Sequence, residues 1–321
     1  MTFYLFMKTL YPEISPFNQF FLETEGVHQV YVEQSGNPAG IPVIFLHGGP
    51  CSGTKPDHRC FFDPKRYHII LMDQRGCGQS LPFGELQGNT TQHLLEDMER
   101  IRLRLRIDQW LLFGGSWGGT LALLYALEYP QSVSAMILRG VFLARKTDMA
   151  WFLTDGVNRI YPQRWQALLD VIAAKTGDDI LTGLSQAVFG ANEELAKSVA
   201  REWQCWGGQV ALGSEFQLDN NQNPDDRAIK QVRMELHYAK NNYFVPDDHI
   251  LQNCSRLQTI PMVIVHGQQD LTCPLEAGWR LHRALPHAEY SVLKNAGHIA
   301  RGEEMINALV SATDEMARRL A

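Results

Sequence analysis

A chain of 321 residues is long enough for one large α/β domain with an insertion, or for two domains. Its formal net charge of −6 gives no reason to expect a nucleic acid or an anionic membrane as a partner. Its six cysteines lack the paired spacing of a zinc site, and we interpret them as reduced thiols in a cytoplasmic protein.

The first half of the chain alternates between apolar runs and amphipathic segments. The apolar residues at 3–7 are followed by Lys8 and Pro12, so we expect neither a secretory leader nor a membrane span. We expect residues 41–46 to pair with the strand at 28–34, and Asn89 or Thr90 to cap a helix that runs to about 106. The alternation predicts a mostly parallel, doubly wound sheet. The predicted strands are 28–34, 41–46, 67–72, 110–113 and 134–138, with a further helix at 120–127.

A long helical segment interrupts this pattern, because the next convincing strand begins near Pro261. Ordinary crossovers between parallel strands need only a dozen or so residues, so the segment is an insertion. We predict a core domain of residues 1–140 and 255–321, and a helical cap domain of residues 141–254. The predicted cap helices are 153–160, 165–174, 179–188 and 193–206.

The most informative motif lies at residues 114–119, which read Gly-Gly-Ser-Trp-Gly-Gly. A strand is predicted before the motif and a helix after it, so Ser116 falls on a sharp strand-to-helix turn. Glycines on both sides let the backbone pass closely, and the helix N-terminus favours developing negative charge. A glycine-rich turn with an incidental serine is the alternative, but the context favours Ser116 as a nucleophile.

A serine nucleophile needs a base, and the base needs an orienting carboxylate. Asp270 follows the predicted strand at 261–267, and His298 follows the predicted strand at 290–293. Serine, acid and histidine therefore occur in the order typical of α/β hydrolases. Individually, Asp270 could cap the next helix and His298 could be an ordinary loop residue. Asp73 is a competing acid, to which we assign a structural role.

A glycine-rich loop at 47–50, His-Gly-Gly-Pro, follows the predicted strand at 41–46. Hydrolases of this kind take one oxyanion-hole N–H from such a loop and one from the residue after the nucleophile. The expected donors are the backbone N–H groups of Gly49 and Trp117. A simple tight turn is the alternative interpretation of this loop.

Together these motifs resemble the proline iminopeptidases (prolyl aminopeptidases), which are serine peptidases of the α/β-hydrolase fold. The resemblance extends from about Tyr11 to the last helix. It rests on His-Gly-Gly-Pro at 47–50, Asp-Gln-Arg-Gly-Cys-Gly-Gln-Ser at 73–80, Gly-Gly-Ser-Trp-Gly-Gly-Thr at 114–120 and His-Gly-Gln-Gln-Asp at 266–270.

This resemblance implies an enzyme that releases an N-terminal residue, preferably proline, from a small peptide with a free N-terminus. It implies no metal and no cofactor, and it implies that Glu235 binds the substrate amine. Two positions depart from the family: Gly207 follows a Trp-x-x-Trp pair where a second glutamate is usual, and Cys51 replaces a glycine. The alternative function is therefore a general ester or amide hydrolase of the same fold. The oligomeric state stays unknown from the sequence.

Overall fold

The structure is a computed structural model that describes residues 7–173, 179–218 and 224–321. The predicted apolar stretch at 3–6 and position 174, the end of one predicted helix, lie outside the described residues. In the described part of the chain, no helix is both long enough and apolar enough to cross a bilayer.

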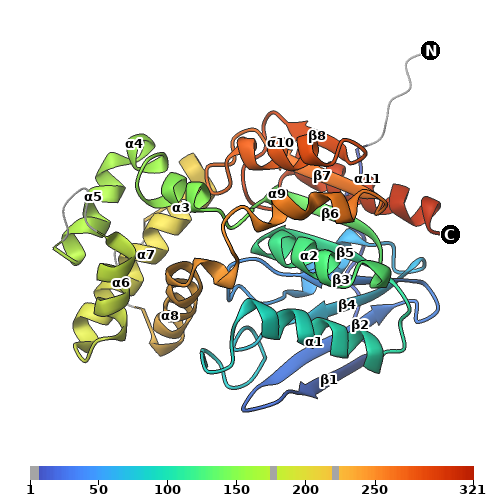
Figure 1. Cartoon of the computed structure of the whole chain (residues 1–321), viewed down its shortest axis with the longest axis horizontal. Coiled ribbons are helices and arrows are strands. Elements are labelled where there is room, and N and C mark those ends of the chain that lie inside the picture. Colours follow the sequence, from blue (N-terminus) through green and yellow to red (C-terminus); the bar gives the residue numbers. More distant parts are fainter. Residues whose placement is uncertain (1–6, 174–178, 219–223) are drawn as a thin grey trace.

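An eight-stranded sheet occupies the centre of the described chain, in the order β1-β2-β4-β3-β5-β6-β7-β8 (Figure 1). The six strands from β4 to β8 in this order run parallel, whereas β2 is antiparallel to β4 and to β1. This arrangement confirms the predicted α/β-hydrolase fold class. The strands are β1 (Asn18–Glu23), β2 (Gln29–Gly36), β3 (Ile41–Leu46), β4 (Tyr67–Met72), β5 (Trp110–Ser116), β6 (Val133–Val141), β7 (Met262–Gly267) and β8 (Glu289–Leu293).

The pairing of β2 differs from the prediction. Its neighbours are β1 and β4, so the expectation that residues 41–46 pair with it is wrong. Strand β4 lies between β2 and β3 in the sheet. The apolar content of a strand does not specify which strand lies beside it. Strand β1 was not predicted, because it is an edge strand in which only Leu22 is fully buried.

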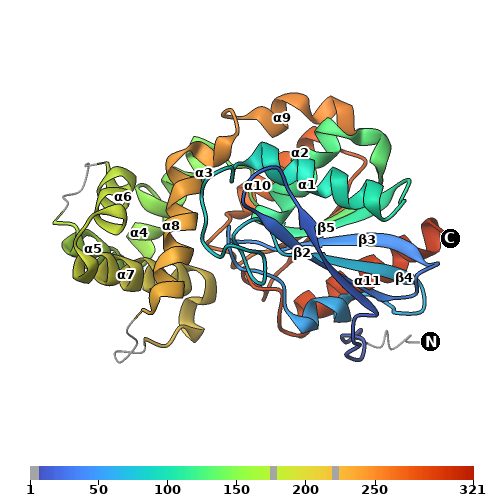
Figure 2. The same cartoon turned by 90° about the horizontal axis from the view of Figure 1, so that it is seen from below.

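Helices cover both faces of the sheet. Figure 2 shows α1 and α2 on one side of it and α11 on the other. Alternate residues of β3 point to opposite faces of the sheet. Ile44 and Leu46 belong to the hydrophobic cluster under α2, whereas Val43 and Phe45 belong to the cluster under α11. The core helices are α1 (Thr91–Arg104), α2 (Trp117–Glu128), α9 (His249–Asn253), α10 (Leu275–Ala284) and α11 (Glu303–Arg319).

The start of α1 differs in detail from the expected capping. Thr90 occupies the cap position, but its hydroxyl contacts His93 Nδ1 at 2.7 Å and makes no capping bond to the backbone. The Asn89 side chain turns away from the helix and donates to the carbonyl oxygens of Arg75 and Glu85, at 2.9 and 3.0 Å. The Asn89 side chain therefore fastens the preceding loop instead of the helix.

The helical insertion lies beside the core in Figure 1 and has a hydrophobic cluster of its own. Trp165 and Trp206 pack at its centre, with ring centroids 5.2 Å apart. The predicted helix at 153–160 is broken, because Gly156 lies against Trp151 and separates two short helices. Helix α9 packs on α2 of the core, and the domain boundaries at 141 and 254 stay a prediction. The helices are α3 (Lys146–Leu153), α4 (Val157–Ile160), α5 (Pro162–Val171), α6 (Ile180–Phe189), α7 (Glu193–Leu212) and α8 (Asp226–Lys240).

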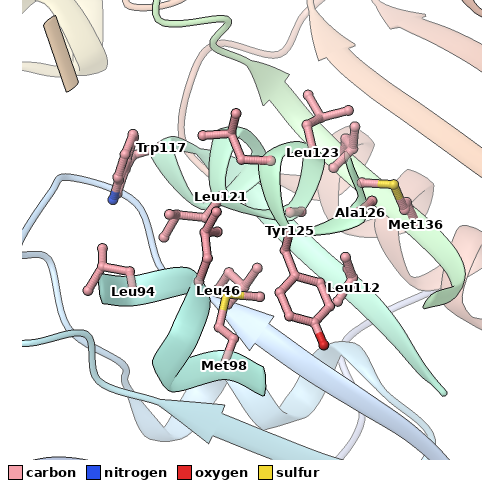
Figure 3. Packing of buried hydrophobic residues seen from close by; sticks show 14 of the residues in the cluster. Leu46, Leu94, Met98, Leu112, Trp117, Leu121, Leu123, Tyr125, Ala126 and Met136 are labelled. Atoms are coloured by element: carbon pink, nitrogen blue, oxygen red, sulfur yellow. The ribbon is translucent and has the colours of Figure 1, made fainter. Parts of the chain in front are cut away.

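Helix α2 is the most enclosed helix of the core. All of its residues except the last are buried, and Figure 3 shows Leu121, Leu123 and Tyr125 packed among side chains of α1 and the sheet. Its N-terminus touches backbone: a Cβ on Gly118 would lie 2.0 Å from the carbonyl oxygen of Leu46. Only glycine permits this approach of helix to strand.

We therefore predict that Gly118→Ala lowers the free energy of unfolding by at least about 2 kcal/mol, because the methyl group has no space. Gly119→Ala is the matched control, since its Cβ would meet its nearest neighbour at 3.5 Å. The control should change stability by less than about 1 kcal/mol. Thermal unfolding followed by tryptophan fluorescence measures both variants, and equal midpoints would contradict the packing argument.

Candidate active site

Ser116 is the last residue of β5, and α2 begins at the next residue. Its backbone has φ 55° and ψ −128°, a conformation that is costly for a residue with a side chain. A Cβ on Gly114 would lie 2.3 Å from the carbonyl oxygen of Gly118, so the two arms of the turn are in contact. This is the geometry that holds a serine hydroxyl clear of a sheet.

The Ser116 side chain faces a cavity of about 110 Å³ at the carboxyl ends of the parallel strands. Gly49 and Pro50 form one wall of this cavity. The remaining lining includes the aromatic residues Phe142, Phe152, Trp203 and Tyr243 and the carboxylates Asp148 and Glu235. A larger hollow of about 930 Å³ lies among Ile41, Arg66 and Ala321, and it contains none of the predicted site residues.

Asp270 and His298 lie together, as the sequence predicts. His298 Nδ1 donates to Asp270 Oδ2 at 2.8 Å, and the backbone N–H of Cys273 donates to Asp270 Oδ1 at 2.8 Å. Burial acts to raise the pKa of the Asp270 carboxyl, but the neighbouring His298 and His266 rings and the backbone donor hold it below its usual value. Asp270 is therefore an ionised, buried acceptor that fixes the His298 ring.

Ser116 is not hydrogen-bonded to His298 in the described structure. Its Oγ contacts Cys273 Sγ at 3.9 Å instead. His298 lies beside the strand that pairs with Ser116: Ser116 pairs with Val141, and a Cβ on the preceding Gly140 would lie 3.3 Å from His298 Nδ1. Serine–histidine contacts in enzymes without substrate are often long, and they tighten in the reacting complex.

The predicted oxyanion donors flank Ser116. Trp117 is the first residue of α2, where helix geometry leaves N–H groups without intrahelical acceptors. Among the described residues, the Gly49 N–H has no hydrogen-bond acceptor, and Gly49 has φ 114°. Cys51 also has a left-handed backbone, with φ 79°. Its thiol points toward the Gly76 carbonyl at 3.6 Å, so this departure from the family does not alter the cavity wall.

Asp73, the competing acid, has other partners. Its Oδ1 accepts from Thr54 N at 2.6 Å and Thr54 Oγ1 at 2.8 Å, and its Oδ2 accepts from Gln79 N at 2.7 Å. The carboxylate therefore ties the segment after the His-Gly-Gly-Pro loop to the Asp-Gln-Arg-Gly loop. Its hydrogen bonds do not include His298.

Two buried residues near the triad candidates were missed by sequence reasoning. Arg139 on β6 donates to the carbonyl oxygen of His298, and a Cβ on Gly115 would collide with its guanidinium. His266 Nε2 donates to the Cys273 carbonyl at 2.8 Å, and burial lowers the pKa of this ring. Both residues belong to strands that read as ordinary core strands; His266 begins the motif at 266–270, but neither residue was assigned a role from the sequence.

Glu235 lies on α8 and borders the cavity without an ionic partner among the described residues. Its Oε2 accepts from Trp203 Nε1 at 2.6 Å, and its Oε1 accepts from Gln231 Nε2 at 3.1 Å. Burial raises the pKa of the Glu235 carboxyl, whereas these two donors act to lower it. A cation that enters the cavity would meet a carboxylate that is hydrogen-bonded but not neutralised.

Gly207 also borders the cavity, and a Cβ there would meet nothing within 4 Å. The open space marks the place of the second glutamate that the family usually carries. The nearby glutamates do not fill it: Glu202 pairs with Arg164 at 2.9 Å, and Glu215 pairs with Arg301 at 2.6 Å.

The other cavity carboxylate, Asp148, is already neutralised. Arg145 Nη2 lies 2.6 Å from Asp148 Oδ1, and the same guanidinium lies 2.7 Å from Glu276. Glu235 is therefore the carboxylate of this cavity that is available to a bound amine.

Helix α8, which carries Glu235, is fastened to the loop between β4 and α1. Tyr238 OH donates to Asn89 Oδ1 at 2.7 Å, and the His237 ring bonds the Asn89 carbonyl at 2.9 Å. About three turns earlier on the helix, Arg227 donates to the Gly78 carbonyl at 2.8 Å. These contacts fix α8 on the core while its other face presents Glu235 to the cavity.

Comparison with known proteins agrees with this geometry. The profile of the alpha/beta hydrolase fold family matches residues 41–304. A probable proline iminopeptidase of Leptolyngbya boryana is 42% identical over 96% of this chain and 97% of its own length. A proline iminopeptidase of Arabidopsis thaliana is 40% identical over 96% of this chain and 82% of its own. An alpha/beta fold family hydrolase from Bacillus anthracis shares the fold at 21% identity and a TM-score of 0.59, covering 93% of this chain and all of its own.

The fold and the elbow serine thus define the chain as an α/β hydrolase. Identity of about 40% over nearly the whole length goes further than the fold. The chain belongs to the proline iminopeptidase family.

We predict that Asp270→Asn lowers kcat by about 10³- to 10⁴-fold, because an amide cannot hold His298 in the required tautomer. Asp73→Asn should lower thermal stability while it keeps most of kcat, because its partners are backbone donors and Thr54. Steady-state kinetics on a chromogenic substrate compares the two. Full kcat in Asp270→Asn with loss in Asp73→Asn would show that the orienting carboxylate is Asp73.

Proposed function

We propose that this protein is a serine aminopeptidase that releases an N-terminal residue, preferably proline, from small peptides with a free N-terminus. The observation that carries the proposal is the unneutralised Glu235 carboxylate in the same cavity as the elbow serine. Membership of the proline iminopeptidase family supports it. The insertion supplies α7 and α8 to this cavity, and we assign it the role of a cap over the site.

The reaction that we propose uses three side chains. His298 Nε2 takes the proton of Ser116 Oγ as the oxygen attacks the scissile carbonyl, while Asp270 holds the ring through Nδ1. The N–H groups of Gly49 and Trp117 stabilise the oxyanion. His298 then protonates the leaving amine, the acyl group remains on Ser116, and a water molecule releases it by the same steps.

Substrate selection rests on charge. The protonated amine or imine of the N-terminal residue pairs with Glu235, and a buried charge is tolerated only when it is paired. A blocked N-terminus has no charge to offer and would leave Glu235 unpaired. The aromatic rings of Phe142, Phe152 and Tyr243 surround the space for the side chain of that residue.

One observation favours a second candidate function. The open space at Gly207 leaves a single available carboxylate where the family usually has two. A charged hydrogen bond contributes about 1.5–3 kcal/mol, so amine recognition is weaker by that amount. A general ester or amide hydrolase would need no such recognition. A panel of prolyl, other aminoacyl, N-acetylated and simple ester substrates separates the two functions.

We also propose that the protein works in the cytoplasm on peptides produced by other proteases. All six cysteines are buried and unpaired within the described residues, as expected in a reducing compartment. Cell fractionation with an antibody tests this, and recovery from an extracytoplasmic fraction would contradict it.

The first test concerns the nucleophile. Ser116→Ala should fold normally and lose several orders of magnitude in kcat, because triad residues act as a unit. A serine-directed organophosphate should label Ser116 alone in the wild-type protein, as measured by peptide mass spectrometry. Labelling of another residue, or turnover by the alanine variant near the wild-type rate, would reject the assignment.

The second test concerns Glu235. Glu235→Gln should raise KM for a prolyl amide by about 10-fold or more, since a charged bond of about 1.5–3 kcal/mol is lost. Hydrolysis of a neutral ester should scarcely change. The carboxylate protonates as pH falls through its raised pKa, so wild-type KM for the prolyl amide should rise on acidification, and Glu235→Gln should lack that rise.

Glu202→Gln is the control for this test, because Glu202 lies outside the cavity and pairs with Arg164. Equal losses for charged and neutral substrates in Glu235→Gln would show a structural role for Glu235. Gly207→Glu provides the reverse experiment: a carboxylate placed in the open space should lower KM for prolyl substrates and leave the neutral ester unaffected.

A further inference from the structure

Gln74 occupies an unusual position between the two predicted halves of the oxyanion hole. It is the second residue after the end of β4 and is buried. It is not among the residues that line the active-site cavity, so it does not meet substrate. Its side-chain amide instead contacts both segments that carry the oxyanion donors: the nitrogen lies near the carbonyl oxygen and Nδ1 of His47, and the oxygen accepts from Trp117.

The first bond reaches the glycine-rich loop. Gln74 Nε2 donates to the carbonyl oxygen of His47 at 2.8 Å, two residues before Gly49. The backbone N–H of Gln74 also donates to His47 Nε2 at 3.1 Å. Since Nε2 accepts, the proton of the neutral His47 ring is on Nδ1, which donates to the Gly48 carbonyl at 2.9 Å. The loop backbone is therefore held at two successive carbonyl groups.

The second bond reaches the residue after the nucleophile. Trp117 Nε1 donates to Gln74 Oε1 at 2.9 Å, and the indole is completely buried. Its ring otherwise packs against Tyr238 and Tyr243, at centroid distances of 5.3 Å each. The hydrogen bond to Gln74 therefore fixes the position of the Trp117 indole.

We propose that Gln74 is a positioning residue that fixes the distance between the two oxyanion donors, the N–H groups of Gly49 and Trp117. This inference rests on the proposed function, which assigns those donors. Oxyanion donors act only when they lie 2.7–3.1 Å from the oxygen that becomes charged. Displacement of such a group by about 1 Å can cost about 100-fold in rate. The Gln74 amide, hydrogen-bonded to the glycine-rich loop and to Trp117, opposes that displacement.

Glutamine suits this role better than other side chains. Its amide offers a donor and an acceptor on one rigid plane, and here the loop carbonyl needs the donor while the indole needs the acceptor. A carboxylate would lose the donor, and an apolar side chain would lose both. Either change leaves buried polar groups without partners, which displaces the backbone that carries them.

The test is Gln74→Met, which keeps the volume and removes both bonds. We expect kcat to fall by about 10- to 100-fold for both a prolyl amide and a p-nitrophenyl ester, with KM within twofold of wild type. The inhibition constant of phenylboronic acid should rise by the same factor as kcat falls, because its tetrahedral adduct on Ser116 places an oxygen in the oxyanion hole. Trp117→Phe removes the other half of the indole bond and should reproduce part of the loss.

Gln34→Met is the matched control. Gln34 is also a buried glutamine bonded to a histidine, with its Oε1 3.0 Å from His68 Nε2, but it lies on β2 far from the cavity. It should lower the thermal midpoint without changing kcat. The proposal is overturned if folded Gln74→Met keeps kcat within twofold of wild type, if only KM rises, or if Gln34→Met loses as much kcat.

The ester separates this result from the proposed function. A wild-type protein that hydrolyses the ester but no prolyl amide would reject the aminopeptidase assignment, and the ester kinetics of Gln74→Met would still decide the role of Gln74. Conversely, full ester turnover by Gln74→Met beside normal prolyl amidase activity in the wild type would reject the positioning role alone.

Discussion

The contact between the N-terminus of α2 and the end of β3 is the constraint on which the site depends. Helix and strand backbones touch at Gly118 and Leu46, with no room for a side chain. This contact forces the chain to turn at Ser116 within a single residue, and it sets the glycine-rich loop after β3 beside the nucleophile. The enclosed apolar surface of α2 supplies the burial that stabilises the strained turn.

The polar groups around this contact differ in how fully their hydrogen bonds and charges are satisfied. The Asp270–His298 pair is buried, and backbone donors hold the other oxygen of the Asp270 carboxylate. Glu235 accepts hydrogen bonds from Trp203 and Gln231 but has no ionic partner among the described residues. Ser116, Asp270 and His298 belong to the sheet and the loops after its strands, whereas Glu235 belongs to the insertion.

The sequence predicted what depends on local pattern. The alternation of buried strands and helices, confirmed by the sheet, and the order of Ser116, Asp270 and His298 were all readable from motifs and apolar runs. The neighbours of β2 were not, because pairing across a sheet depends on crossovers between distant segments. The contacts of Gln74 and Arg139 were not predicted either, although Gln74 belongs to a recognised motif, because both residues bond segments that are distant in the sequence.

The fastening of α8 to the core has a consequence for access to the cavity. Moving α8 away from the core would break the hydrogen bonds of Asn89 to Tyr238 and His237. Polar atoms that are left without partners make such a movement unfavourable. A movement of the insertion that keeps these bonds must spare α8 and fall on elements farther from the core, such as α4 and α5 (Figure 1). Glu235 lies on α8, so such a movement would leave its position relative to Ser116 unchanged.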